Sequence, residues 1–167
     1  FKDKNALLGA LIHTGNESNF KRLILGRGWG TINEDGLLDS SAWDNFIKKC
    51  QDDGTLTKAD YDLVQGIWDT LESVKPDTQK AFKEMNGYYF DEIKAKEVLT
   101  PFGVYRGGYV PATPDNHESI DADIRDTKAK VEGGFMAELP KKNDGFTKSR
   151  ENGYATPLLM DLSLITT

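Results

Sequence analysis

A mainly α domain is the fold class that the sequence predicts, as a bundle of four to five helices with one small β-hairpin around residues 101–110. Apolar residues recur at helical spacing through residues 1–98, the predicted helical core. One later stretch, Thr100–Pro111, combines alternating apolar residues with glycines and bracketing prolines, which is typical of a short strand or hairpin. The chain has 167 residues, the length of one domain, so we expect a single hydrophobic core.

Two short helices are predicted at the start of the chain. Apolar spacing predicts a helix over residues 5–13. A second helix, capped by Asn16 or Ser18, is expected to end at Gly26. His13 could be a ligand or a base, but no second histidine lies nearby in the sequence, so a role in packing or capping is favoured.

Glycine-rich turns follow the second helix and recur between the later helices. The Gly26–Gly30 stretch follows a helix, and its spacing matches no phosphate-binding loop, so it predicts a turn that inserts Trp29 into the core. The loop around Gly54 resembles a calcium-binding EF-hand loop, but Lys49 falls at its first ligand position. The loop around Gly36 lacks the final carboxylate. Both are therefore predicted to be Asp-Gly turns between helices.

The longer helices are predicted between residues 39 and the nineties. A third helix opens at residue 39 with one apolar face. A capping box at residues 57–60 opens the longest helix, in which Gly66 is expected to allow close approach of another helix. Pro76 is expected to interrupt this helix, and a further helix is predicted from Asp77 into the nineties.

The predicted hairpin belongs to a segment of hairpin and linker over residues 99–116. Within it, Arg106-Gly-Gly108 is expected to supply the turn, and Val104 and Tyr109 are candidates for burial. Arg106 could bind a phosphate or a carboxylate. A surface ion pair at the hairpin tip is the favoured alternative.

The last third of the chain is more polar and more interrupted. A peripheral helix is predicted over residues 117–134, followed by an irregular arm and the start of a following segment over residues 135–167. The chain begins without methionine and ends within the apolar run Pro157–Ile165, so we expect one domain of a longer protein. Whether residues 157–165 form a strand in this domain or belong to the next one stays open.

Composition and charge limit the function classes. The 38% hydrophobic and 29% charged residues are typical of soluble globular proteins. The formal net charge of −6 gives no general attraction to phosphate backbones or anionic membranes. The sequence predicts no transmembrane segment and no signal peptide. The single cysteine, Cys50, is expected to be a buried thiol on a helix.

Four segments, over residues 5–16, 25–30, 101–111 and 145–150, resemble segments of very large phage and prophage polyproteins, the polyvalent or internal virion proteins. Such proteins string many domains together and are packaged in the particle or carried with the DNA. The resemblance therefore implies the virion or the bacterial host cytoplasm as location, with other domains of the parent polypeptide or other virion proteins as partners. The methyltransferase, helicase, peptidase and transglycosylase motifs of the family are absent from this sequence, so the resemblance implies no catalytic residues.

Three functions are compatible with these observations. The favoured one is a non-catalytic structural or interaction domain, with a contiguous exposed apolar or aromatic patch near the hairpin and the end of the chain. The second is a fragment of a phage enzyme that binds an anionic substrate. The third is nucleic-acid binding through the basic late segment, which the net charge disfavours. No catalytic, cofactor-binding or metal-ligating residue and no cofactor is predicted; the candidate anion or partner contacts are Tyr105, Arg106, Tyr109, Lys148 and Arg150.

Overall fold

The computed structural model of the chain describes residues 1–115, 157–160 and 162. These residues form four α-helices, one 3-10 helix and two antiparallel strand pairs, which confirms the predicted mainly helical fold with a small hairpin. The predicted helix 117–134 and most of the arm 135–167 lie outside the described residues. The elements in chain order are α1 (Lys4–Leu11), η1 (Ile12–Gly15), α2 (Glu17–Gly26), β1 (Thr31–Ile32), β2 (Leu38–Asp39), α3 (Ser41–Asp52), α4 (Lys58–Asn86), β3 (Val98–Thr100) and β4 (Gly103–Tyr105).

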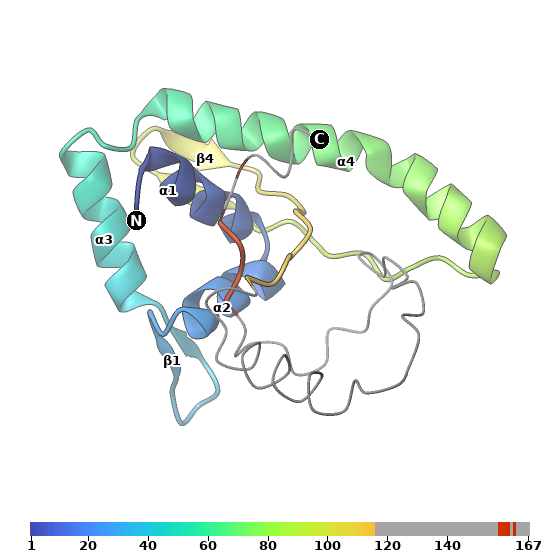
Figure 1. Cartoon of the computed structure of the whole chain (residues 1–167), viewed down its shortest axis with the longest axis horizontal. Helices are drawn as coiled ribbons and strands as arrows, with labels where there is room; N and C mark the ends of the chain where they lie inside the picture. The colour runs from blue at the N-terminus through green and yellow to red at the C-terminus, as the bar shows by residue number, and fades with distance from the viewer. Residues whose placement is uncertain (116–156, 161, 163–167) are drawn as a thin grey trace, which may run out of the picture.

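The short helices α1, η1 and α2 supply much of the core, and α4 runs across one side of them (Figure 1). The carboxylate of Asp3 caps α1 by accepting the Ala6 N–H at 2.8 Å. Asn16 caps α2 in the same way, because its side-chain oxygen accepts the Asn19 N–H at 2.9 Å. The predicted cap at Asn16 is therefore confirmed.

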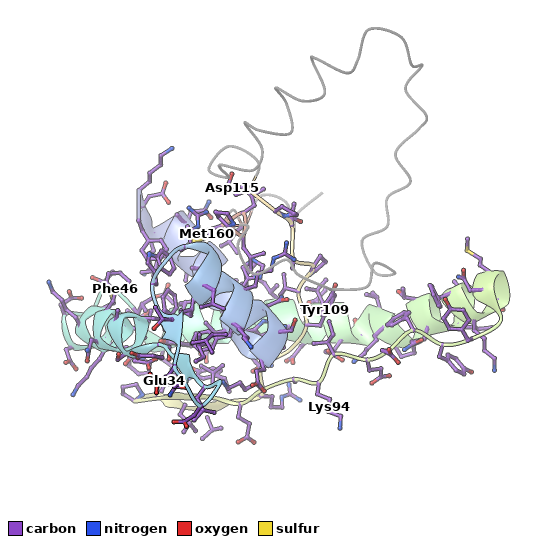
Figure 2. The ribbon with its side chains drawn as sticks, turned by 90° about the horizontal axis from the view of Figure 1, so that it is seen from below. Glu34, Phe46, Lys94, Tyr109, Asp115 and Met160 are labelled. Carbon is purple, nitrogen blue, oxygen red and sulfur yellow. The ribbon has the colours of Figure 1, made fainter. Side chains whose placement is uncertain are left out.

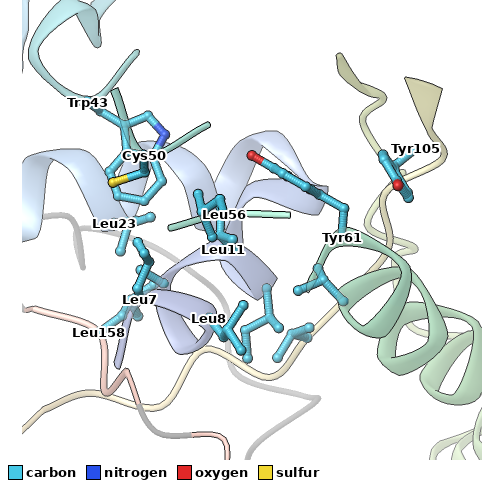
Figure 3. Close-up of a cluster of buried hydrophobic side chains, with 14 of the residues drawn as sticks. Leu7, Leu8, Leu11, Leu23, Trp43, Cys50, Leu56, Tyr61, Tyr105 and Leu158 are labelled. Carbon is cyan, nitrogen blue, oxygen red and sulfur yellow. The ribbon is translucent and has the colours of Figure 1, made fainter. Parts of the chain in front are cut away.

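Helices α3 and α4 bury one face each against this centre. Cys50 on α3 is a buried free thiol, as predicted, and burial raises its pKa. The predicted capping box that opens α4 is present, since the Asp60 carboxylate accepts the Thr57 N–H at 2.8 Å. Trp68 on α4 is buried, and Trp29 stacks on Trp43 of α3 with ring centroids 5.5 Å apart. Figure 3 shows part of the resulting cluster.

The predicted helix break at Pro76 is wrong, because α4 continues through this residue and ends at Asn86. Gly87, with φ of +82°, then ends the helix in the left-handed conformation. Tertiary contacts hold the region around the proline. The Gln79 amide donates to the Phe90 carbonyl at 3.0 Å and accepts the Phe90 N–H at 3.1 Å. The predicted helix into the nineties is therefore wrong beyond Asn86. Residues 87–97 form a non-helical return segment, which contains Lys94 (Figure 2).

The hairpin lies earlier in the chain than predicted. Its two-residue loop is Pro101-Phe102, and its register pairs Leu99 with Val104 and Val98 with Tyr105. The shift turns Val104 outward and Tyr105 inward, so the predicted burial of Val104 and the predicted turn at residues 106–108 are both wrong. Proline fits the first central position of a β-turn, which explains why the loop forms there.

A second strand pair, β1–β2, encloses the turn at residues 33–36. The prediction of a turn there is confirmed, but the turn joins two strands and not two helices. Gly66 was predicted to permit close helix approach, and this is wrong, since a β-carbon there would meet nothing within 4 Å.

Close backbone approach occurs instead around Trp68. The indole N–H donates to the Ile12 carbonyl at 2.8 Å. The carbonyl of Gly15 accepts the N–H groups of Lys96 at 2.8 Å and Gly108 at 2.9 Å. A β-carbon at Gly15 would lie 2.5 Å from the Trp68 ring, so only glycine fits this contact. The chain that leaves β4 is therefore fixed to η1.

Buried amide side chains strengthen this attachment. Asn16 donates to the Gly108 carbonyl at 3.2 Å, and Asn19 donates to the Val110 carbonyl at 2.7 Å. His13 is buried, with its Nδ1 atom 3.4 Å from the Asn19 side-chain nitrogen. His13 therefore packs inside the fold, the interpretation that the sequence favours.

The late segment 157–160 belongs to the same core. The Asp115 N–H donates to the Pro157 carbonyl at 2.8 Å, and the Leu159 N–H donates to the Thr113 carbonyl at 2.9 Å. Leu158 is fully buried, and its carbonyl accepts a hydrogen bond from the Arg27 guanidinium at 2.8 Å. Whether the segment from residue 157 belongs to this domain was left open by the sequence. Residues 157–160 do belong to it, because they pair with residues 113–115.

Candidate functional site

Of the predicted contact residues, Tyr105 lies at the end of β4 and faces the helices. Its ring stacks on Tyr61 with centroids 5.4 Å apart. Its hydroxyl donates to the Asp62 carboxylate at 2.9 Å. Burial, followed by this bond, raises the pKa of Tyr105, whereas the hydrogen bond from Lys58 is the main cause of the lowered pKa of Asp62. Tyr105 thus joins the hairpin to α4.

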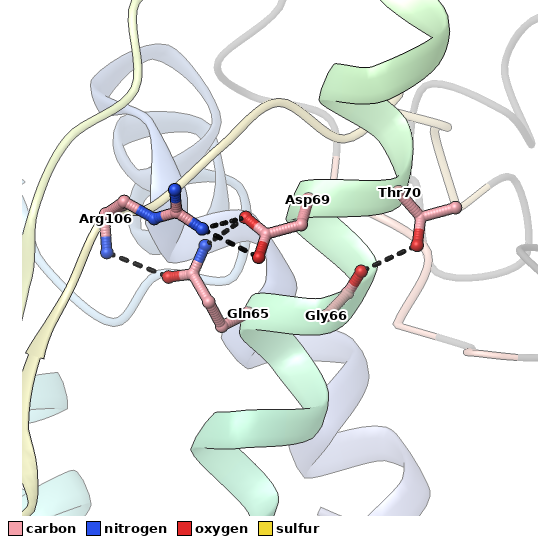
Figure 4. Close-up of polar contacts among 5 residues, drawn as sticks. All are labelled: Gln65, Gly66, Asp69, Thr70 and Arg106. Atoms are coloured by element: carbon pink, nitrogen blue, oxygen red, sulfur yellow. Dashed lines mark hydrogen bonds and ion pairs between the residues drawn. The ribbon is translucent and has the colours of Figure 1, made fainter.

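Arg106 forms a surface ion pair, as the sequence favoured, but it follows β4 and does not lie at the hairpin tip. Its Nη2 donates to both carboxylate oxygens of Asp69 at 2.8 Å (Figure 4). Its backbone N–H donates at 2.8 Å to the side-chain oxygen of Gln65, whose nitrogen donates in turn to Asp69 at 2.8 Å. An anion at Arg106 would face the negative charge of this carboxylate.

The predicted contacts do not form one described cleft. Tyr105 and Arg106 contact different carboxylates, and Tyr109 lies where the chain has left the hairpin (Figure 2). Lys148 and Arg150 lie outside the described residues.

We expect the Arg106–Asp69 pair to contribute little to stability. In a double-mutant cycle of Arg106→Ala and Asp69→Ala, the coupling free energy should be about 0.2–1 kcal/mol, because both side chains are exposed. Urea unfolding at low and high salt measures it, and the coupling should fall at high salt. A coupling that exceeds this range and persists at high salt would contradict a simple surface ion pair.

A groove beside the hairpin is the more promising feature. It lies between α3 and residues 96–99 and has a volume of about 330 Å³. Trp43 and Ile47 of α3 line one wall, and Leu11, Phe20 and Tyr61 contribute further apolar surface. The groove therefore combines apolar and aromatic side chains with polar ones, namely Thr14, Ser40, Asp44, Gln51, Lys96 and Glu97.

The groove follows the edge of β3. Side chains of alternating residues in a strand point to opposite faces, yet all four residues from Lys96 to Leu99 line the groove. No residue of β4 lines it. The groove therefore runs along the side of β3 that β4 does not occupy.

Two carboxylates line the groove from opposite walls. Asp44 belongs to α3 and accepts a hydrogen bond from the Ser40 hydroxyl at 2.9 Å, whereas Glu97 precedes β3. Neither forms an ion pair with a residue that the structure describes. The one cation of the lining, Lys96, lies over the Phe20 ring, with Nζ 5.0 Å from its centroid.

The outer face of the hairpin adds an apolar surface next to the groove. Leu99 and Val104 are cross-strand partners, and they are 76% and 61% exposed. Phe102 in the loop contacts Tyr61, with ring centroids 5.9 Å apart. Sequence reasoning expected an apolar patch near the hairpin but placed Val104 inside. It also missed that α3 lines the groove. In the sequence, the apolar face of α3 indicates only a core-facing helix, because the position of the hairpin is not known.

A larger hollow of about 730 Å³ lies between the second half of α4 and the return segment. Its charged groups already pair, because Lys75 lies 3.1 Å from Glu72 and 3.5 Å from Glu92. The contacts of Gln79 with Phe90 hold its two sides together. These contacts account for the residues there in structural terms.

Residues 1–115, 157–160 and 162 contain no group of three or more His, Cys, Asp or Glu side chains that could hold a metal ion. In the same part of the chain, no helix has the length and apolar character needed to span a bilayer. The chain matches no family model, no curated protein and no solved structure.

Proposed function

We propose that this chain is a non-catalytic interaction domain of a large phage-encoded polyvalent or internal virion protein. The hairpin β3–β4 and the groove along β3 form the surface that a partner binds. The partner is another domain of the parent polypeptide or another virion protein, in the particle or in the host cytoplasm. The exposed Leu99–Val104 pair beside an aromatic-lined groove is the observation that carries this proposal.

Burial of this pair by a partner would be favourable. Fully burying a leucine or valine side chain contributes about 1.5–3 kcal/mol, and both project from one face of the hairpin. Contact with aromatic side chains in a desolvated groove is a frequent source of binding energy. The hairpin is also firmly placed, because the Tyr105 hydroxyl and the backbone N–H groups of Arg106 and Gly108 attach it to α4 and η1. A rigid surface loses less conformational entropy on binding.

The resemblance supports the phage context. Two of its segments, residues 5–16 and 101–111, contact one another through the backbones of Gly15 and Gly108. The resemblance therefore falls on the residues that hold the hairpin in place.

Site-specific photocrosslinking tests the proposal. We expect a benzoylphenylalanine at Leu99 of the full parent protein, produced in cells where particles assemble, to crosslink to one defined peptide of the parent or of a virion protein. Leu63, which is 51% exposed on α4, is the matched control position. Mass spectrometry of the crosslinked peptides reads the result. Equal products at both positions, or none at Leu99, would refute the proposed surface.

A further inference from the structure

Resting on the proposed function, we infer that the partner contributes an extended peptide, which adds to the free edge of β3 as a third strand. This peptide carries alternating apolar side chains and a lysine or arginine. The inference rests on the direction of the backbone groups of β3, on the groove that follows them, and on the two carboxylates that line it.

The hydrogen bonds around the hairpin fix which edge is free. The Lys96 N–H reaches the Gly15 carbonyl, which also accepts the Gly108 N–H from the chain that continues β4. Lys96, Val98 and Thr100 therefore direct their backbone groups toward the β4 side. By alternation, Glu97 and Leu99 direct theirs away from β4. Their N–H groups have no hydrogen-bond partner among the described residues.

The opposite edge of the hairpin is covered where the chain leaves β4. The backbone N–H of Arg106, which follows β4, points outward and is accepted by Gln65 of α4. A side-chain amide of the helix thus occupies the place that a neighbouring strand would take. Val104 of β4 also directs its backbone groups outward, but no residue of β4 lines the groove, whereas Glu97 and Leu99 do.

The groove selects the side chains of an added strand. Residues of a strand beside β3 would alternate in the same way as Val98, which faces inward, and Leu99, which faces outward. Every second side chain would enter the groove, where Trp43, Ile47 and Tyr61 offer contacts to an apolar group. The backbone hydrogen bonds supply affinity, and these pockets supply specificity.

The charges of the groove indicate that the added peptide carries a basic side chain. Asp44 and Glu97 line opposite walls of the groove without an ion pair to a described residue, whereas Lys96 is held over Phe20. An incoming basic side chain would neutralise this excess of negative charge, and an acidic one would be repelled.

A peptide titration tests strand addition directly. The probes are end-blocked peptides Lys-Φ-Thr-Φ-Thr-Φ-Lys, in which Φ is Val, Leu or Phe, added to the isotope-labelled 167-residue chain. We expect at least one to bind, with slowed hydrogen exchange at the Glu97 and Leu99 amides. Replacing both lysines of that peptide by glutamate should weaken binding about tenfold.

Backbone methylation separates strand addition from side-chain contact. One version of the binding peptide is N-methylated on its threonines and the other on its Φ residues, so each loses the N–H groups of one edge. One version should fail and the other should bind. Asp44→Asn should weaken binding about threefold, while Glu34→Gln, in the β1–β2 turn, should not change it.

Binding by none of the peptides, unchanged exchange at Glu97 and Leu99, or equal binding of the two methylated versions would overturn strand addition. If specific crosslinks at Leu99 persist in that case, the proposed function stands and the partner uses side chains of the hairpin face alone. If the crosslinks are absent as well, both proposals fail.

Discussion

Gly107→Ala is expected to lower the free energy of unfolding by about 2–5 kcal/mol, the sum of a left-handed backbone cost and an overpacking cost. Gly107 has φ of +74°, and a β-carbon there would collide with the backbone carbonyls of Lys96 and Gly15, the latter at 2.6 Å. Both carbonyls belong to the main chain around Trp68, so neither can move aside as a flexible side chain would. Urea unfolding followed by tryptophan fluorescence measures the loss.

Gly54→Ala is the matched control. Gly54 has nearly the same backbone angle, φ of +78°, but its β-carbon would meet nothing within 4 Å. This variant should lose only about 1–2 kcal/mol, the backbone cost alone. Equal losses in the two variants would show that the close contact of Gly107 with η1 does not form, and the hairpin would then lack its described support.

The helices could be predicted from the sequence because their signals are local. Caps at Asn16 and Thr57 and apolar spacing on α3 and α4 each act within a few residues. The prediction at Pro76 was wrong because it considered local signals alone. Its local preference favours a break, but α4 continues through it, and Lys75 and Gln79 on either side contact Glu92 and Phe90 of the return segment.

The hairpin shows how a small error in register changes a predicted site. Two turn signals compete within one stretch, at Pro101-Phe102 and at Arg106-Gly-Gly108. The first forms the turn, while the glycines at 107 and 108 serve the approach to Gly15 and Trp68. With the turn placed at the wrong signal, Val104 was expected inside, although it is exposed.

The groove could not be predicted from the sequence, because its walls come from several helices and from β3, whose relative positions no local signal gives. Trp43 and Ile47 of α3 read as ordinary core residues in the sequence, and the position of β3 opposite them depends on the Gly15 contacts. The pairing of Arg106 with Asp69 could be expected in kind. The identity of the partner as Asp69 could not be predicted, because 37 residues separate Arg106 from Asp69 in the chain.

Leu158→Ala is expected to lower the free energy of unfolding by about 2–5 kcal/mol, because it leaves a cavity at a fully buried site. Leu158 belongs to the same hydrophobic cluster as Leu7 and Leu23 (Figure 3). Its backbone is fixed by the pairing of residues 157–159 with residues 113–115 and by Arg27, which also pairs with Asp115 at 3.0 Å. A shift of the segment to fill the cavity would break these bonds.

Leu99→Ala provides the control for Leu158→Ala, because the same truncation at a 76% exposed side chain should change stability by no more than about 0.5 kcal/mol. Urea unfolding of both variants decides the matter. A large loss for Leu158 alone would make residues 157–160 part of the folding unit, so the surface beside β3 should be studied only in chains that retain them. A loss as small as that of Leu99 would instead place this segment outside the core, and the apolar run that follows Pro157 would then be a second candidate for partner contact.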